Sequence, residues 1–131
     1  MQTINSKTIV FITGAFVGKN CWNEWENYFQ KKGYTTLTPA WPHKDASPED
    51  LRNRQPDAEI ASIRLAGLTS YFENIIKQLP EKPILIGHSM GGLIIQILLQ
   101  RNMAAAGIAI HSVPPLGVFT FKKEFYKASW G

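Results

Sequence analysis

The sequence contains very little cysteine, since Cys21 is the only one among its 131 residues. A single thiol excludes a disulfide within the chain, and without a second cysteine nearby it also excludes a cysteine-rich metal site. This usage favours a protein of the cell interior, and we expect a cytoplasmic location. Cys21 precedes an aromatic, helix-like segment, where we expect it to be a small buried filler.

Long hydrophobic runs and clustered charge of one sign are also missing. No segment approaches the roughly 18 uninterrupted apolar residues of a transmembrane helix, and the first residues lack the apolar core and cleavage site of a secretion signal. The formal net charge is +4, but the lysines and arginines are scattered and mostly interleaved with acids. The densest basic segment, residues 119–126, fits a solvated or partner-covered segment better than a nucleic-acid site. We therefore expect no membrane and no nucleic-acid partner.

What is present is the composition of one folded globular domain. Hydrophobic residues make up 44% of the chain and charged residues 18%, which excludes disordered and fibrous proteins. The length suits a single core, and the sequence shows no internal repeat or low-complexity tract. We therefore expect residues 1–131 to form one domain.

Four short apolar segments predict strands. The first is apolar and β-branched without alternation, which is typical of a strand covered on both faces. Glycine or proline lies at or soon after the end of each segment, and proline cannot continue a ladder. The expected strands are residues 8–13, 34–38, 83–87 and 108–111.

Helices are expected between these strands. Aromatic residues at spacings of three and four predict a helix over residues 21–33, with Gly33 as its stop. After a polar surface connection, an apolar stripe predicts a long helix that begins near Asp57 and ends before Pro80. Residues 90–102 are apolar nearly all round, which predicts a buried helix.

This alternation of strands and helices predicts the α/β class, as a three-layer sandwich with a mostly parallel four-stranded sheet. Each crossover must be right-handed and cover one face of the sheet. In such sheets, ligands bind beyond the carboxyl ends of the strands, where the strand order reverses. The turn after the third expected strand lies at such an end.

The pattern G-x-S-x-G stands at that turn, over residues 87–91. A serine on a strained turn between a strand and a helix needs very small residues two positions before and after it, because the backbones pass closely there. Gly87 and Gly91 meet this demand, and Gly92 adds clearance. Ser89 is therefore the predicted nucleophile, and its alternative is a small residue in a glycine-rich turn.

The residues beside the serine have different expected roles. A helix that begins at Met90 would direct its free N–H groups and positive dipole end toward developing negative charge. We call the turn over residues 87–91 the nucleophile elbow. His88 lies on the far side of this elbow from the serine hydroxyl, so we expect it to pack there rather than act in catalysis.

Three segments together resemble the α/β-hydrolase superfamily, in its serine esterase and lipase-like branch: "VFITGAF", "CWNEWENYFQKKGYTTLTPAWP" and "PILIGHSMGG". The resemblance covers the first half of that fold and therefore implies a truncated α/β-hydrolase fold. It implies that the N–H groups of Ala15, with Phe16 as the lesser candidate, and of Met90 form the oxyanion hole. It also implies a small-molecule ester or other acyl substrate, no cofactor and no metal.

The superfamily orders its catalytic residues as nucleophile, acid and histidine, and both partners follow later strands. The 42 residues after Ser89 contain no aspartate, one glutamate, Glu124, and one histidine, His111. The resemblance therefore implies that the strands carrying the acid and base are absent, and residues 112–131 look like the start of a cap region. His111 ends the fourth expected strand and is the only candidate base, with Glu124 as its orienting acid. Its alternative is a packing or loop-capping residue.

Other polar and aromatic residues have structural interpretations. His43, Asp45 and Glu49 follow the second expected strand, which the resemblance implies to lie at the outer edge of the sheet, far from the serine. We expect them to form a solvated loop rather than a metal site. Three tryptophans are expected in the core or in a pocket wall: Trp22, Trp25 and Trp41.

Two functions stay open from the sequence. The first is an α/β-hydrolase-type protein that carries the nucleophile half of an ester-hydrolysing site and is incomplete or weakly active alone. The second is a non-catalytic truncated remnant or binding module. A four-stranded parallel sheet that ends near the centre of the parent fold would leave an exposed edge and an apolar face. Such surfaces favour a homodimer or a complementing second chain.

Overall fold

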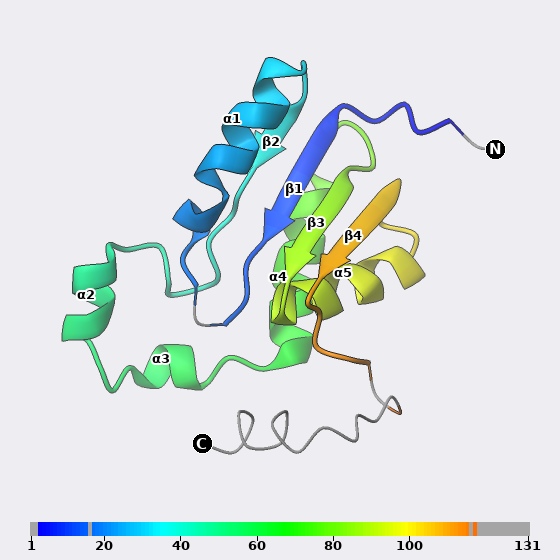
Figure 1. The fold of residues 1–131 in the computed structure, drawn as a ribbon. Helices are drawn as coiled ribbons and strands as arrows, with labels where there is room; N and C mark the ends of the chain where they lie inside the picture. Colours follow the sequence, from blue (N-terminus) through cyan, green and yellow to red (C-terminus); the bar gives the residue numbers. More distant parts are fainter. Residues whose placement is uncertain (1–2, 16, 116, 118–131) are drawn as a thin grey trace.

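Four parallel strands form one sheet in the order β2-β1-β3-β4 (Figure 1). The computed structural model describes residues 3–15, 17–115 and 117. The strands are β1 (Thr8–Ile12), β2 (Thr35–Leu37), β3 (Ile84–His88) and β4 (Ala106–Ile110). The parallel sheet and the outer position of β2 confirm the sequence predictions, and β4 lies beside β3.

Helices cover both faces of the sheet. α1 (Asn23–Lys31) follows the short 3-10 segment η1 (Lys19–Trp22) and lies on one face, beside β1 and β2. α4 (Leu65–Lys77) and α5 (Met90–Gln100) lie on the other face, as Figure 1 shows. The shorter helices α2 (Pro48–Asn53) and α3 (Ala58–Ala61) connect β2 to α4 away from the sheet. These three layers confirm the predicted architecture.

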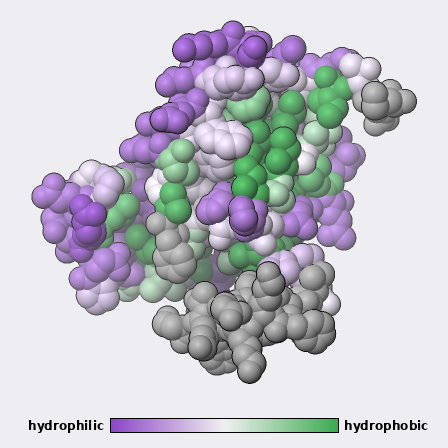
Figure 2. All heavy atoms as spheres, in the orientation of Figure 1, coloured by the Kyte–Doolittle hydropathy of each residue, from purple (hydrophilic) through white to green (hydrophobic). Residues whose placement is uncertain are grey.

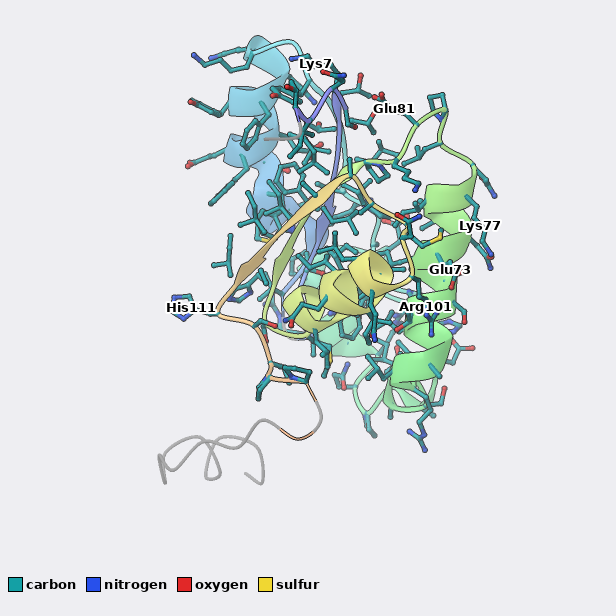
Figure 3. All side chains as sticks on the ribbon, turned by 90° about the vertical axis from the view of Figure 1, so that its right-hand side faces the viewer. Lys7, Glu73, Lys77, Glu81, Arg101 and His111 are labelled. Carbon is teal, nitrogen blue, oxygen red and sulfur yellow. The ribbon has the colours of Figure 1, made fainter. Side chains whose placement is uncertain are left out.

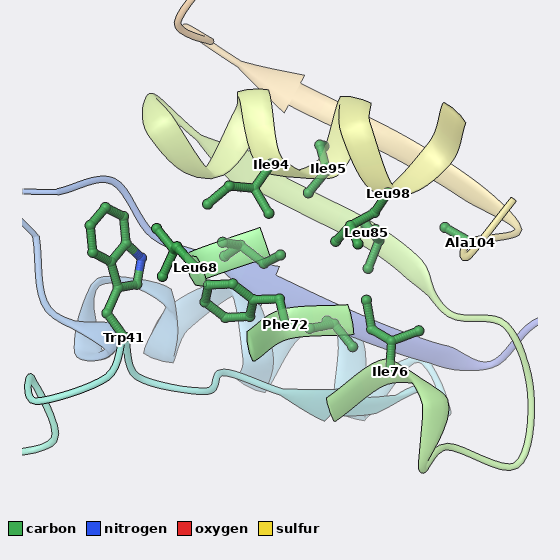
Figure 4. Close-up of a cluster of buried hydrophobic side chains, with 11 residues drawn as sticks. Trp41, Leu68, Phe72, Ile76, Leu85, Ile94, Ile95, Leu98 and Ala104 are labelled. Carbon is green, nitrogen blue, oxygen red and sulfur yellow. The ribbon is translucent and has the colours of Figure 1, made fainter. Parts of the chain in front are cut away.

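The side-chain alternation of β1 builds a core on each face. Ile9 and Phe11 point to the α1 side and pack with Trp22, whereas Val10 and Ile12 point to the opposite side. All of β1 is buried, as its unbroken apolar run predicted. Figure 4 shows the second core, in which apolar side chains of α4 and α5 interlock: Leu68, Phe72, Ile76, Ile94, Ile95 and Leu98.

Part of the α1 face stays open. α1 packs over one half of this face, and Figure 2 shows apolar side chains gathered over the strands that α1 leaves uncovered. Ile108 on β4 is 52% exposed, and it lies on the same face as the half-buried Ile110 because the two residues are two positions apart. Exposed apolar strips of this kind are common where proteins meet other proteins.

The long helix expected from near Asp57 is interrupted, so that prediction was wrong. Asp57 accepts hydrogen bonds from the N–H groups of Glu59 and Ile60 at 3.0 and 3.2 Å, and this cap starts only the short α3. Arg64 is extended, with φ −111° and ψ 150°, before α4 begins. An extended residue breaks the ladder of helical hydrogen bonds, so the apolar stripe continues on a second helix.

The polar segment expected to be a surface connection contains α2. The Oγ of Ser47 accepts a hydrogen bond from the N–H of Asp50 at 3.1 Å, and Pro48 occupies the first turn. The capping sequence Ser-Pro-Glu-Asp was the signal for this helix. Sequence reasoning missed it because the segment lacks the apolar stripe that marks a longer helix.

The tryptophans and the cysteine near α1 divide between core and surface. Trp22 and Trp41 are buried as expected, with 4% and 7% of their surface exposed. Trp25 is 43% exposed, and Cys21 is exposed as well, so the prediction of a buried cysteine was wrong. The reason is that η1 turns only one of its four residues, Trp22, into the core.

Within the described part of the chain, no helix is long and apolar enough to cross a membrane. Residues 118–131 lie outside the described residues, and so does Phe16. The expected cap-like segment beyond residue 117, its basic stretch and Glu124 therefore carry no structural description.

Phe72→Ala tests the core between α4, α5 and the sheet. Phe72 is fully buried, and truncation of such a side chain costs about 3–5 kcal/mol of unfolding free energy. Tyr28→Ala is the control, because Tyr28 is 58% exposed on α1 and its loss should cost about 0.5 kcal/mol. Urea unfolding followed by circular dichroism measures both. An equal loss in the two variants would contradict the described core.

Candidate active site

Ser89 occupies a strained turn between β3 and α5. Its φ is 57° and its ψ is −119°, a conformation that residues with a side chain rarely adopt. Hydrogen bonds to the chain at the end of β4 hold it there. The N–H of Ser89 donates to the Ile110 carbonyl at 3.1 Å, and the N–H of Val113 donates to the Ser89 carbonyl at 3.1 Å. The turn lies at the carboxyl end of β3, where the sequence predicted a ligand site.

Glycine is required beside this serine because neighbouring segments of the chain lie too close for a β-carbon. A β-carbon on Gly91 would lie 2.7 Å from the carbonyl carbon of Ile12 and closer still to its oxygen. A β-carbon on Gly87 would lie 2.6 Å from the carbonyl carbon of Gly91. On Gly92 it would lie 2.7 Å from the Cβ of Ser112. These contacts give the steric reason for the glycine spacing of the motif.

The end of β1 brings a second backbone segment to the serine. A β-carbon on Gly14 would lie 2.9 Å from the Cβ of Ser89 and 3.4 Å from its Oγ, so this loop passes directly beside the hydroxyl. Ala15 follows in the loop, and Met90 is the first residue of α5. The first N–H groups of a helix have no acceptor within the helix and carry partial positive charge. The structure thus brings Ser89, Ala15 and Met90 to one place.

Two side chains from the segment after β2 hold the loop beside the serine. The indole N–H of Trp41 donates to the Thr13 carbonyl at 3.1 Å, and the ammonium of Lys44 donates to the Ala15 carbonyl at 2.6 Å. The Lys44 Nζ also lies 4.9 Å from the centroid of the Trp41 ring. Partial burial lowers the pKa of Lys44. No short motif marks these residues, and sequence reasoning assigned Trp41 only to the core or a pocket wall.

A cleft of about 780 Å³ opens beside the site, and both Ala15 and Met90 line it. Its walls are mainly apolar and include Trp41, Ile63 and Leu68. Clefts of about 300–1,000 Å³ with apolar walls and few polar groups are the usual sites for small molecules. The exposed thiol of Cys21 lines the same cleft, and its partial enclosure raises its pKa.

The two histidines near the elbow lie in different surroundings. His88 is the half-buried last residue of β3, which suits the packing role expected of it. His111 follows β4 with a φ of 43° and is exposed. Figure 3 shows its ring projecting away from the sheet. The structure therefore does not bring the ring of the candidate base to the serine.

The polar residues after β2 point to separate partners. The Nδ1 of His43 lies 3.2 Å from a carboxylate oxygen of Glu59, and Asp45 pairs with Lys19 at 2.6 Å. Glu49 lies in the first turn of α2. The part of the chain that the structure describes holds no group of three or more metal-ligating side chains.

Residues 9–131 match the model of a family described as the alpha/beta hydrolase family. The chain belongs to this family. The resemblance drawn from the elbow and the first strand is therefore confirmed. The parallel sheet of this alpha/beta hydrolase is the part of the fold that carries the strained serine turn.

Solved structures share this alpha/beta-hydrolase fold. An extracellular alpha/beta-hydrolase from a Paenibacillus species is 25% identical with a TM-score of 0.67, and the match covers 92% of this chain and 48% of that one. That protein is described as sharing structural and functional homology with tobacco salicylic acid binding protein 2.

Two further structures, at lower identity, show the fold alone. Tomato methylketone synthase I complexed with 2-tridecanone is 21% identical with a TM-score of 0.65, and the match covers 95% of this chain and 46% of that one. Polyneuridine aldehyde esterase is 16% identical with a TM-score of 0.65, with 95% and 48% covered. This alpha/beta-hydrolase chain thus spans about half the length of the structures it matches. No curated protein sequence matches it significantly.

Gly91→Ala tests the close contact that forms the elbow. The added methyl group would overlap the Ile12 carbonyl, and overpacking of this kind costs about 1–3 kcal/mol or more. Gly67→Ala on α4 is the control, because an added β-carbon there meets nothing within 4 Å and should stabilise the helix by about 0.5–1 kcal/mol. Thermal unfolding compares the two. A melting temperature for Gly91→Ala at or above that of the parent protein would contradict the contact.

Proposed function

We propose that this chain carries the nucleophile half of a serine acyl-hydrolase site, with esters or related acyl compounds as substrates. One observation carries the proposal: Ser89, on its strained turn, lies directly beside the loop that follows β1 and next to a cleft lined by Ala15 and Met90. Membership of the alpha/beta hydrolase family supports acyl chemistry at this serine.

The reaction proceeds by acyl transfer to the serine. The Oγ of Ser89 forms a bond to the acyl carbon while its proton passes to a base, and the carbonyl oxygen becomes an oxyanion. The N–H groups of Ala15 and Met90 donate to this oxyanion. The bond to the alcohol oxygen then breaks, and the alcohol leaves with the proton. Water releases the acid by the same steps.

In this proposal, Lys44 holds the loop that follows β1 and carries the Ala15 N–H group; we call this segment the oxyanion loop. Its bond to the Ala15 carbonyl restrains the peptide plane that follows the Ala15 N–H. Its ammonium also adds positive charge beside the place where the oxyanion forms. Because the side chain is partly buried, water screens that charge less than it would at an exposed site.

The base and acid require a separate source. His111 serves as the base only if its ring turns from its exposed position toward Ser89. We favour a base and an acid from a complementing second chain, because the residues outside the described part of this chain include no histidine. The apolar strip around Ile108 is an available surface for such a partner.

Binding without catalysis is the second candidate function. The exposed ring of His111 favours it, because a serine without a base within reach is only an alcohol. The cleft would then hold its ligand without turnover. Covalent labelling separates the two functions.

Labelling with a fluorophosphonate tests the nucleophile. We expect one adduct per chain by intact mass, located at Ser89 by peptide mapping, because the phosphonate imitates the tetrahedral intermediate. Ser89→Ala should lose both the adduct and any hydrolysis of p-nitrophenyl acetate, whereas Ser70→Ala, at an exposed serine of α4, should keep them. Equal labelling or equal hydrolysis in the parent protein and Ser89→Ala would remove Ser89 as nucleophile.

The rate of fluorophosphonate labelling of Ser89 also tests whether His111 is the general base. Because its ring points away from the sheet, His111→Ala should leave the rate essentially unchanged. A general base contributes about a hundredfold or more to such a step. A loss of that size in His111→Ala, with the fold intact by circular dichroism, would assign the base to His111.

Lys44→Met tests the support of the oxyanion loop. Removal of the 2.6 Å bond to Ala15 frees the loop, and we expect labelling of Ser89 to slow by about tenfold or more. Lys44→Arg should keep most of the rate, since a guanidinium also donates to a carbonyl. Lys31→Met, at an exposed lysine of α1, controls for the loss of one positive charge. Equal rates for Lys44→Met and Lys31→Met would contradict the role.

A further inference from the structure

The four arginines of the chain differ in how they are paired. Arg54 lies 3.0 Å from a carboxylate, and Arg101 lies 2.9 Å from another. Arg52 and Arg64 form no salt bridge with any carboxylate among the described residues. These two are the arginines that line the cleft beside the serine.

The remaining charges of the cleft are positive too. Lys44 lines it, and so does Lys19, which is already paired with Asp45 at 2.6 Å. Among the described residues, no aspartate or glutamate lines the cleft. Basic groups around a low-dielectric wall concentrate anions in the space between them. These walls and charges suit a ligand that is apolar over most of its surface and carries one negatively charged group.

We propose that the cleft selects acyl compounds whose apolar body carries a carboxylate, and that Arg52 and Arg64 bind this carboxylate. The planar guanidinium offers paired N–H donors that match the two oxygens of a carboxylate. Because the acyl carbon would lie at Ser89, the assignment of a substrate rests on the function proposed above.

The two arginines and the residues beside the serine line the cleft from different segments of the chain. Arg52 lies on α2, which Figure 1 shows away from the sheet, and Arg64 lies between α3 and α4. Ala15 and Met90 lie at the carboxyl ends of the strands. A ligand that spans the cleft is thus held at two ends, by the arginines at its carboxylate and by the N–H groups at its acyl carbonyl.

Alkylation of Cys21 measures occupancy of the cleft without catalysis. Cys21 is the only cysteine, is exposed, and lines the same cleft. The probes are 4-phenylbutyrate and its neutral counterpart 4-phenylbutanamide, at one fixed pH because enclosure raises the thiol pKa. We compare the concentrations of the two probes that halve the alkylation rate of Cys21. The concentration needed should be about tenfold or more lower for the carboxylate than for the amide, because only the carboxylate forms charge-assisted hydrogen bonds to arginine.

Charge-matched variants assign the preference to the two arginines. In the double variant Arg52→Gln/Arg64→Gln, the carboxylate and the amide should slow the alkylation of Cys21 at equal concentrations. Lys31→Gln/Lys82→Gln, which removes two exposed charges that do not line the cleft, should keep the preference. Circular dichroism confirms that each variant is folded. Equal protection by the two probes in the parent protein, or a preference that survives in Arg52→Gln/Arg64→Gln, would overturn the proposal.

Ser89→Ala separates this inference from the proposed function. The variant keeps every group that binds the carboxylate, so it should show the same preference as the parent protein. A preference in Ser89→Ala, together with a failed fluorophosphonate labelling, removes the catalytic function and keeps the carboxylate site. Successful labelling with no preference removes the carboxylate site and keeps the nucleophile.

Discussion

At Gly91 the backbone of α5 lies against the backbone at the end of β1, and a β-carbon there would lie 2.7 Å from the Ile12 carbonyl carbon. Any larger residue would push the first turn of the helix away from the sheet. That movement would also separate Ser89 from Gly14, where an added β-carbon would lie 2.9 Å from the Cβ of Ser89. The positions of the serine, the neighbouring loop and the N-terminus of α5 therefore all depend on one steric requirement. Position 91 must be glycine, which has no β-carbon.

The rest of the core holds this contact in place. A residue in the conformation of Ser89 costs about 1–3 kcal/mol, and each fully buried aliphatic or aromatic side chain stabilises the fold by about 1.5–3 kcal/mol. Ile94, Ile95 and Leu98 of α5 are fully buried between α4 and the sheet. Pairing of β4 with β3 adds the hydrogen bond from the Ser89 N–H to Ile110. The strain at the elbow is thus offset by packing outside it.

Local sequence patterns predicted the parts of the fold that depend on local chemistry. The apolar run of β1 and the glycines around Ser89 mark a buried strand and a tight turn without reference to any distant residue. The interruption at Arg64 and the bonds from Trp41 and Lys44 were beyond such patterns. These last bonds join segments 28 and 29 residues apart, and only the folded sheet brings them together. The exposure of Cys21 likewise follows from which way η1 turns, which spacing alone does not encode.

A crystal structure of the fluorophosphonate adduct would locate the oxygen that stands in for the oxyanion. We expect a bond between phosphorus and the Oγ of Ser89, with the phosphonyl oxygen about 3 Å from the backbone nitrogens of both Ala15 and Met90. Lys44 should still donate to the Ala15 carbonyl. An adduct on another residue, or a phosphonyl oxygen that contacts neither N–H group, would contradict the roles proposed for Ser89, Ala15 and Met90.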